Sequence, residues 1–456
     1  MTRSLQEAVF EYRAARGLIA AAMTTRGRMA LGSGNLYRAL GDLCWVTRVS
    51  NVGPFGRIAE RVVNETIATL RREPRNVVLD SYRADPASAA CASLYALTGK
   101  GPHDLWRDLI VLKRATAEEK GVILLKYVRT FNAVASMFDL PRLMKRYTFV
   151  LEPCWAGYCD PSLLMYIAPG NPVLVQCFTE EDYRFVAETG GPLVPIRLGP
   201  ADWVDADLFK PAAEKKSYDL VMVANWAPHK RHAQLFRALH EIRDRQVRVL
   251  LIGFAWANRT AADVRREAER FGPPGMHLDI IENLPPTEVA AHVSQSKVFV
   301  FLSRKEGDNK ALVEAMFAGV PAIVYDKTIG GARSRINAST GVLASDAELP
   351  AKIVDMIDHY DRFTPREWVL EHTGSANATR ILNDALARAV TSAGGRYTEG
   401  IVEKTNSPNL AYKDPSCRAR FRADYEFILG CRSDVPRSGA LARDGERAVV
   451  KRDAVA

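Results

Sequence analysis

Residues 297–326, KVFVFLSRKEGDNKALVEAMFAGVPAIVYD, decide the fold class. An apolar run is followed by a polar turn, a helical pattern over 309–318 and a second apolar run. Two buried strands joined by a helix are typical of a parallel sheet that is covered on both faces. Glu306 in the turn and Glu314 on the helix lie eight residues apart. The pattern therefore predicts an α/β fold and leaves open why a strand-to-helix turn carries two carboxylates.

The same alternation of strand and helix runs through most of the chain. Two such series imply two open sheets, and ligands of open α/β sheets bind outside the carboxyl ends of the strands. We therefore predict two Rossmann-like, doubly wound parallel-sheet domains with a central cleft. The expected strands are 76–82, 121–128, 147–153 and 172–178 in the first series, and 218–226, 247–254, 277–284, 297–303 and 321–326 in the second.

The predicted domains follow from where these series begin and end. A stretch rich in Pro, Asp and Trp, residues 192–211, is typical of a connector between domains. The expected parts are a helical N-terminal extension over 1–75, a first domain over 76–200, a second domain over 201–390, a segment over 391–432 that returns to the first domain, and a disordered tail over 433–456.

Composition narrows the functional classes. The 456 residues are 47% hydrophobic and 25% charged, as in ordinary globular proteins, and the chain is long enough for two domains. No run of eighteen apolar residues occurs, so we expect no membrane span. Seven cysteines without regular spacing predict reduced thiols and a cytoplasmic location, and Cys154 and Cys159 lack the partners of a zinc site.

The net charge of +9 is unevenly distributed. Residues 1–75 hold twelve arginines, no lysine and six acidic residues. This excess suits peripheral contact with an anionic membrane, such as the inner membrane surface, or a phosphorylated ligand, and it equally suits a solvated face. No basic and aromatic stripe or known module indicates nucleic-acid binding.

The turn over 304–309 is the first candidate site. Gly307 permits unusual backbone angles and close approach of a ligand, and either Asp308 or Asn309 can cap the following helix, whose first residues include Lys310. A helix N-terminus offers unpaired N–H groups to a phosphate. Glu314 would then reach a ribose, and Glu306 would face the attached sugar. The alternative is a solvated Glu306 and a Lys310–Glu314 pair that stabilises the helix by a few tenths of a kcal/mol.

Two other strand ends agree with this interpretation. Lys230 and Arg231 follow the strand over 218–226 and precede a helix, where they could neutralise a departing diphosphate. A basic surface cluster is the alternative. Gly253 ends the next strand and would let a nucleotide approach the backbone.

At these residues the sequence resembles the GT-B glycosyltransferases, and specifically the large retaining family usually numbered four. The resemblance rests on FVFLSRKEGDNKALVEAMFAGVPAIV (299–324), with seven residues between the two glutamates, on DADLFKP (205–211) and on INASTGVLAS (336–345). It covers about residues 200–390, and the first domain matches only in its rhythm of strands and helices.

The resemblance implies a nucleotide-diphospho-sugar donor held by the second domain and an acceptor recognised by the first. Carried over residue by residue, Glu314 would hold the donor ribose, Glu306 would contact the sugar near its anomeric carbon, and Lys230 would hold the diphosphate. We therefore expect Glu306 and Lys230 to be catalytic. The other expected donor-binding residues are Gly307, Asp308, Asn309, Lys310, Arg231, Asn225 and Gly253. The family retains anomeric configuration, generally without a metal or other cofactor, and the chain has no suitable Asp-x-Asp motif.

Two positions depart from the family pattern. Asn225 stands where an arginine is usual, and Arg231 stands where glycine is usual, so a diphosphate contact could have moved to Arg231. The family also often has a first-domain histidine near the reacting sugar, and His103 is a poor match for it. Aromatic rings stack on sugars, so Trp155 and Tyr158 are candidate contacts of a glycan or lipid-linked acceptor, although packing is the commoner role of such residues.

These departures keep other functions open. A non-catalytic GT-B protein that binds a sugar nucleotide or acts as a partner subunit is one alternative. A sugar-nucleotide epimerase or a phosphorylase is another. The expected activity remains retaining, metal-independent transfer of a sugar from a nucleotide sugar, and the donor, the base and the acceptor are not identified by the sequence.

Overall fold

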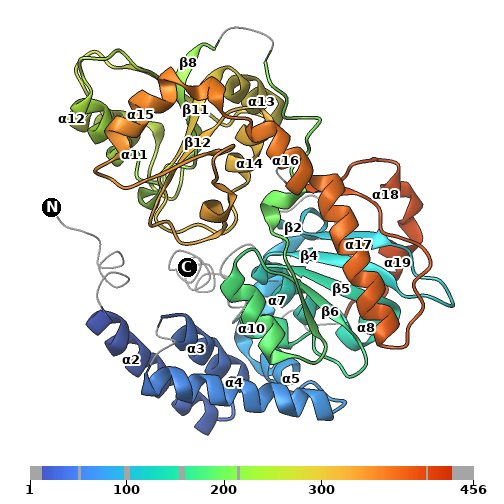
Figure 1. Ribbon diagram of the computed structural model, residues 1–456. Helices are drawn as coiled ribbons and strands as arrows, with labels where there is room; N and C mark the ends of the chain where they lie inside the picture. Colours follow the sequence, from blue (N-terminus) through green and yellow to red (C-terminus); the bar gives the residue numbers. More distant parts are fainter. Residues whose placement is uncertain are drawn as a thin grey trace. The chain divides into compact units, whose positions relative to one another are not determined.

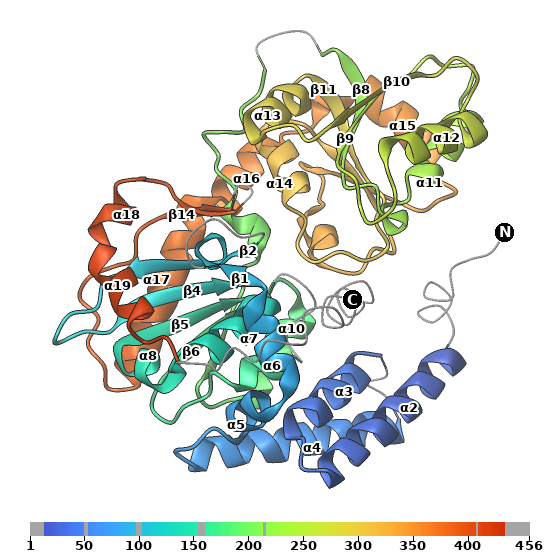
Figure 2. The ribbon, with the colours of Figure 1, turned by 180° about the vertical axis from the view of Figure 1, so that it is seen from behind.

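The computed structural model describes residues 13–49, 53–96, 103–153, 160–212, 216–406 and 409–433, which form two compact units (Figure 1; Figure 2). Both units are α/β structures with largely parallel sheets, which confirms the predicted fold class. Unit 1 comprises Met1–Arg197, Leu382–Glu403 and Leu410–Ala456, and unit 2 comprises Leu198–Ile381 and Lys404–Asn409.

Unit 2 is built on a six-stranded parallel sheet with the order β10-β9-β8-β11-β12-β13. This is the strand order of Rossmann folds, and the order reverses between β8 and β11. The buried positions of the central strands are mostly Val, Leu, Ile, Met and Phe because helices cover both faces. The strands are β8 (Tyr218–Val223), β9 (Arg248–Gly253), β10 (His277–Glu282), β11 (Ser296–Phe301), β12 (Ala322–Tyr325) and β13 (Gly341–Ala344).

The helices of unit 2 divide between the two faces of this sheet, as both views show (Figure 1; Figure 2). One face carries α11 (His232–Glu241), α12 (Ala261–Phe271) and α15 (Leu349–Asp358), and the other carries α13 (Pro286–Ser294), α14 (Lys310–Phe317) and α16 (Pro365–His372). Short elements complete the unit: η2 (Pro200–Trp203), η3 (Pro228–Lys230), η4 (Gly331–Arg335), η5 (Tyr360–Arg362) and β14 (Lys404–Asn406), while α17 (Ser375–Ser392) runs on into unit 1.

Unit 1 contains a five-stranded sheet whose strands follow chain order, β3-β4-β5-β6-β7. β3 is antiparallel to β4, and the other pairs are parallel. Its strands are β3 (Leu109–Lys113), β4 (Gly121–Lys126), β5 (Tyr147–Glu152), β6 (Val173–Gln176) and β7 (Leu193–Ile196), and β1 (Tyr95–Ala96) pairs with β2 (His103–Asp104).

Helices surround this sheet and extend beyond it. Figure 1 and Figure 2 show α2, α3 and α4 packed side by side beyond α5. The C-terminal residues Phe421, Tyr425 and Ile428 are buried in the core of unit 1. The helical elements are α2 (Arg13–Gly32), α3 (Leu36–Val49), α4 (Pro54–Arg72), α5 (Val77–Ala84), α6 (Pro86–Ser93), η1 (Leu105–Arg107), α7 (Val128–Met137), α8 (Leu140–Arg146), α9 (Pro161–Leu164), α10 (Glu180–Thr189), α18 (Cys417–Arg420) and α19 (Arg422–Leu429), and β15 (Leu410–Tyr412) precedes α18.

One predicted strand is wrong. Residues 77–82 form most of helix α5, and Asn76 is its N-cap. The Asn76 side chain accepts hydrogen bonds from Val78 N (3.1 Å) and Leu79 N (3.0 Å). The same side chain donates to the carbonyl oxygens of Leu164 and Ile167 at 2.8 and 2.9 Å, which fixes the cap to the rest of the unit. A side chain that accepts from the first N–H groups favours a helix over a strand, whatever the apolar pattern. The expected tail over 433–456 lies outside the described residues, apart from residue 433.

Candidate functional site

The carboxyl ends of β8 and β11 define the candidate site in unit 2. These strands are neighbours, and the strand order reverses between them. Open α/β sheets bind ligands in the crevice outside such a reversal. β8 leads through Asn225 to η3 and Lys230, and β11 leads to the turn that contains Glu306. The two predicted catalytic residues therefore start from the two strands that flank this point.

Lys230 and Glu306 are in direct contact. The Lys230 ammonium donates a hydrogen bond to Glu306 Oε2, and the Ser303 hydroxyl lies 3.5 Å from the same oxygen. The two side chains are only 9% and 13% exposed. Two opposite charges held together out of water interact far more strongly than a surface pair. The geometry thus places a positive and a negative group side by side where a charged, polar ligand would bind.

The backbone of the Glu306 turn is fixed by the segment that follows β12. Glu306 N donates to Ile329 O (2.9 Å), Ile329 N donates to Arg304 O (2.8 Å), and Gly331 N donates to Gly307 O (3.0 Å). Gly307 was expected to supply unusual backbone angles, but the left-handed position is Gly330, with φ 129°. A Cβ atom at Gly330 would lie 2.0 Å from Glu306 O. Gly330 is therefore required for the position of Glu306.

A Gly330→Ala substitution is expected to destabilise unit 2 and to displace the Glu306 turn. The new methyl group meets backbone rather than a flexible side chain, and the φ angle strains any L side chain, so we expect a loss of about 3 kcal/mol in unfolding free energy. Gly275→Ala is the matched control, because Gly275 also has a positive φ (69°) but open space around it. Urea unfolding of both variants measures the difference, and equal losses would contradict the role given to Gly330.

The residues that open α14 have separate roles. Asn309 caps the helix, since its side chain accepts a hydrogen bond from Leu312 N at 2.8 Å. Asp308, which was predicted to contact the donor, instead has a fully buried side chain paired with Arg335 at 2.8 Å. Asp308 Oδ2 also accepts a hydrogen bond from Ala201 N at 2.9 Å. Asp308 therefore fixes the turn before α14 through its buried contacts, and Asn309 caps the helix.

Arg335 links this turn to the connector between the units. Its guanidinium contacts Asp308 and, at 3.0 Å, the buried Asp202 of η2. Asp202 also accepts hydrogen bonds from Gly199 N (2.8 Å) and from the Thr373 hydroxyl (2.5 Å). Burial raises the pKa of Asp308, and the Arg335 charge lowers it. Four separated segments of unit 2 meet in this network, which supports the start of α14.

Glu314 lies in the second turn of α14 and is partly buried. Burial raises the pKa of its carboxyl group, and the Lys310 charge lowers it. Among the described residues it has no ion pair, and the Lys310 ammonium donates instead to the Asn406 carbonyl oxygen at 3.0 Å. The described residues thus show the Lys310 charge acting on Glu314 without a direct ion pair between the two side chains. A partly desolvated carboxylate is well suited to accept hydrogen bonds from hydroxyl groups.

Arg231 is placed differently from expectation. Its guanidinium forms two hydrogen bonds with Asp346 (2.5 and 2.6 Å), one with Leu302 O (3.3 Å), and lies 4.3 Å from the centre of the Tyr325 ring. These contacts engage its charge within the protein, so the structure does not offer Arg231 as a replacement diphosphate ligand. Its backbone has φ 64°, a left-handed conformation in which glycine is usual. This conformation agrees with the glycine that the resemblance leads one to expect at this position.

Asn225 and Gly253 also have local roles. The Asn225 side chain accepts a hydrogen bond from Ala227 N at 3.2 Å, which shapes the turn into η3. A Cβ atom at Gly253 would lie 2.1 Å from Ala224 O and 2.7 Å from the Trp226 ring. The absent side chain therefore makes room for Trp226, whose indole Nε1 reaches Glu282 at 2.5 Å, and not for a nucleotide.

His232, the first residue of α11, is a buried histidine that the sequence pattern did not single out. Its side chain is buried, and neither ring nitrogen has a hydrogen-bond partner among the described residues. Burial, helped by the nearby charges of Arg259 and Lys230, lowers its pKa from 6.5 to about 3. A pattern of residue types gives no sign of this, because the effect arises from packing against Trp226.

The buried His232 is expected to make the fold sensitive to acid. The unfolded chain takes up a proton near pH 6.5, whereas the folded chain does not until about pH 3, so stability falls between these values as the pH is lowered. At pH 5.5 the loss is about 1.4 kcal/mol relative to neutral pH. Unfolding free energies at pH 7.5 and 5.5 should show this loss in the wild type but not in His232→Leu. The exposed His240 of the same helix provides the control His240→Leu, and an unchanged pH dependence in the His232 variant would contradict the account.

The acceptor contacts expected in unit 1 are Trp155 and Tyr158. Trp155 and Tyr158 lie outside the described residues. They follow β5, whose last residue Glu152 is fully buried beside Lys126 of β4 and Gln176 of β6. Three polar side chains thus end three adjacent parallel strands, in a sheet whose strands follow chain order without a reversal.

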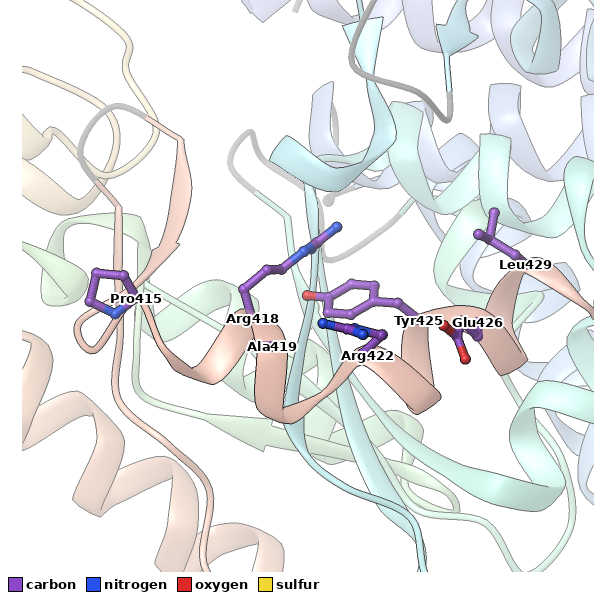
Figure 3. A pocket seen from close by; sticks show the side chains of 7 residues that line it. All are labelled: Pro415, Arg418, Ala419, Arg422, Tyr425, Glu426 and Leu429. Atoms are coloured by element: carbon purple, nitrogen blue, oxygen red, sulfur yellow. The ribbon is translucent and has the colours of Figure 1, made fainter.

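A shallow pocket of about 450 Å³ lies on the α18–α19 surface of unit 1 (Figure 3). The Arg418 guanidinium lies 3.7 Å from the Tyr425 ring centre and 5.5 Å from that of Trp106. None of the predicted site residues lines it, so it is separate from the candidate site. Its lining residues are Pro415, Arg418, Ala419, Arg422, Tyr425, Glu426 and Leu429.

The described part of the chain lacks two other features. It contains no cluster of three His, Cys, Asp or Glu side chains placed to bind a metal ion. None of its helices combines the length and apolar character needed to cross a bilayer.

Comparison with known proteins points to the unit that carries the site. Residues 204–360, about a third of the chain, match the family model described as glycosyl transferases group 1, which confirms the resemblance over this region. A search of curated proteins finds no match. Among solved structures, a sucrose-phosphate synthase from Thermosynechococcus elongatus is 18% identical with a TM-score of 0.48 and covers 60% of this chain and 74% of its own.

Two further solved structures are similar in the same partial way. Anabaena HepE in complex with UDP and glucose is 15% identical with a TM-score of 0.46, and the overlap covers 58% of this chain and 77% of that one. The C-terminal domain of LpcC from Francisella tularensis, a glycosyl transferase group 1 family protein, is 18% identical with a TM-score of 0.32, covering 37% and 97%.

Proposed function

We propose that the protein is a retaining, metal-independent glycosyltransferase that uses a nucleotide-diphospho-sugar donor. The Lys230–Glu306 pair at the strand-order reversal is the observation that carries this proposal. It lies within the residues that match the glycosyl transferases group 1 family. A buried ammonium next to a carboxylate suits a ligand that combines a diphosphate with a sugar.

In the proposed mechanism, the Lys230 ammonium leaves Glu306 to contact the donor diphosphate. The acceptor hydroxyl oxygen bonds to the anomeric carbon as the bond from that carbon to the phosphate oxygen breaks, on the same face of the sugar. The hydroxyl proton passes to the departing phosphate, whose developing charge Lys230 stabilises. Glu306 would face the sugar as positive charge develops near its anomeric carbon, and Glu314 would accept hydrogen bonds from the ribose hydroxyls.

The donor can be found by binding, and catalysis by one substitution. A UDP-, GDP- or ADP-sugar that binds the folded chain should raise its unfolding midpoint. With that donor, Glu306→Gln should release nucleotide about 10²-fold more slowly than the wild type, because a neutral amide no longer stabilises the developing charge. Equal rates with unchanged donor binding would count against catalysis at Glu306. A wild type that binds the donor but releases no nucleotide would instead support a non-catalytic protein that binds a sugar nucleotide.

The acceptor and the location remain proposals. A glycan or a lipid-linked hydroxyl acceptor suits the proposed reaction. The arginine-rich N-terminal helices expose Leu18 and Met29 of α2 on one side of that helix, which favours peripheral contact with an anionic membrane from the cytoplasmic side. Flotation with anionic liposomes tests this, and a chain that stays unbound at low salt would oppose it.

A further inference from the structure

The loop that follows β9 exposes two aromatic rings beside the candidate site. Phe254 is 49% exposed and Trp256 is 42% exposed. Of the Phe and Trp side chains in the described ranges, only these two are exposed, and the others are buried or half-buried. Burying an aromatic ring is normally favourable, so two exposed rings on one short loop indicate a surface that a ligand covers.

The backbone holds this loop firmly at the carboxyl edge of the sheet. Trp226 N donates to Phe254 O at 3.1 Å, and Asn283 N donates to Gly253 O at 2.9 Å, so the loop is fixed to its neighbours on both sides. Trp256 and Arg259 exchange two backbone hydrogen bonds of 3.0 and 2.9 Å around a tight turn.

The tip of this turn is strained. Ala257 has φ 50°, which is unfavourable for a residue other than glycine. Strained residues of this kind are most often kept at ligand sites. The turn thus holds Trp256 on a rigid support, and Phe254 lies two residues before it.

The direction in which a nucleotide would extend from Lys230 favours this loop. On the other side of the reversal, the segment after β12 is bonded to the Glu306 turn and occupies that edge. On the β9 side, the space over Gly253 is filled by the Trp226 ring, so a ligand there meets the exposed rings rather than the backbone. β9 is the neighbour of β8, one strand spacing of about 4.8 Å away.

We propose that Phe254 and Trp256 form a stacking surface for the base of the donor nucleotide. This rests on the proposed function, since it names the part of the same site that binds the nucleoside. Every base has a flat π face, and stacking on aromatic rings contributes to affinity whatever the base. The rings therefore add affinity for any nucleoside diphosphate, and the choice between bases is left to other groups.

Binding of nucleoside diphosphates to the full chain tests the proposal. The probes are UDP, GDP and ADP, with inorganic pyrophosphate as the probe that lacks a base. The double substitution of Phe254→Ala with Trp256→Ala should weaken the best nucleoside diphosphate about 10-fold or more and leave pyrophosphate within twofold, as expected from the loss of stacking. Leu370→Ala on α16, a residue that is also 49% exposed, should change neither.

Fluorescence provides a second measurement. Binding of the nucleotide should quench indole emission in the wild type, and Trp256→Phe should lose most of the quenching while keeping the affinity within about threefold. Unchanged nucleotide binding in the double variant, or an equal loss of pyrophosphate binding, would overturn the stacking surface and leave the proposed function standing. A wild-type chain that binds none of the three nucleoside diphosphates would overturn the proposed function itself, and the stacking surface with it.

Discussion

A Lys230→Met variant is expected to transfer sugar about 10³-fold more slowly than the wild type, measured as kcat with the donor identified by binding. The substitution removes the positive charge that would stabilise the departing diphosphate, and in a water-poor site such a charge has a large effect on the transition state. It also leaves the Glu306 carboxylate facing the diphosphate, so repulsion adds to the lost attraction. The side chains are nearly isosteric in length, which limits the change in packing.

Stability measurements separate this catalytic effect from simple misfolding. Glu306 loses its counterion in the single variant, which should cost about 3 kcal/mol because both side chains are largely buried. Combining Lys230→Met with Glu306→Gln removes both charges and should restore most of the stability while leaving transfer impaired. A single variant that is as stable as the wild type and transfers at a similar rate would contradict both the pair and the proposed reaction.

The sheet of unit 2 could be predicted from sequence because its signal is local. Buried strands such as 297–303 are continuous apolar runs, and each is separated from the next by a helical pattern. Residues 76–82 show the same apolar content, yet a single capping side chain, Asn76, determines that they form a helix. An apolar run shorter than a full helix does not distinguish the two structures, and the cap is visible only when its hydrogen bonds are known.

The sequence was sufficient to predict which turns form the site, but not which side chains contact one another within it. Lys230 and Glu306 were brought together by strand-end reasoning, since both follow strands of one parallel sheet. The partners of Asp308 and Arg231 could not be predicted, because Arg335 and Asp346 are distant in sequence and their pairing depends on the three-dimensional arrangement. A charged residue near a ligand site can bind the ligand or support the residues that do, and residue type alone does not separate these roles.

An Arg335→Met variant is expected to lose about 4 kcal/mol of unfolding free energy, the largest effect on stability predicted for this protein. The guanidinium is shared by Asp202 and Asp308, and its removal leaves two buried carboxylates close together without a counterion. Breaking a buried ion pair on one side costs far more than a surface pair because the remaining charge is desolvated. Arg333→Met, at an exposed position of the same η4 turn, is the control and should change stability by less than about 0.5 kcal/mol.

The pH dependence of the unfolding free energy of Arg335→Met shows whether the variant is destabilised by the loss of charge or by the loss of packing. In the wild type Arg335 opposes the burial that raises the pKa of Asp308, so without Arg335 that pKa should rise further. A carboxyl group whose folded pKa is raised binds its proton more tightly in the folded state, and the folded state therefore gains stability as the pH falls through that pKa. The deficit of Arg335→Met relative to the wild type should accordingly be smaller at pH 5 than at pH 7.5. A loss of unfolding free energy that is constant with pH would mean that Arg335 acts by packing. The start of α14 would then not depend on the ion pairs between Arg335, Asp308 and Asp202.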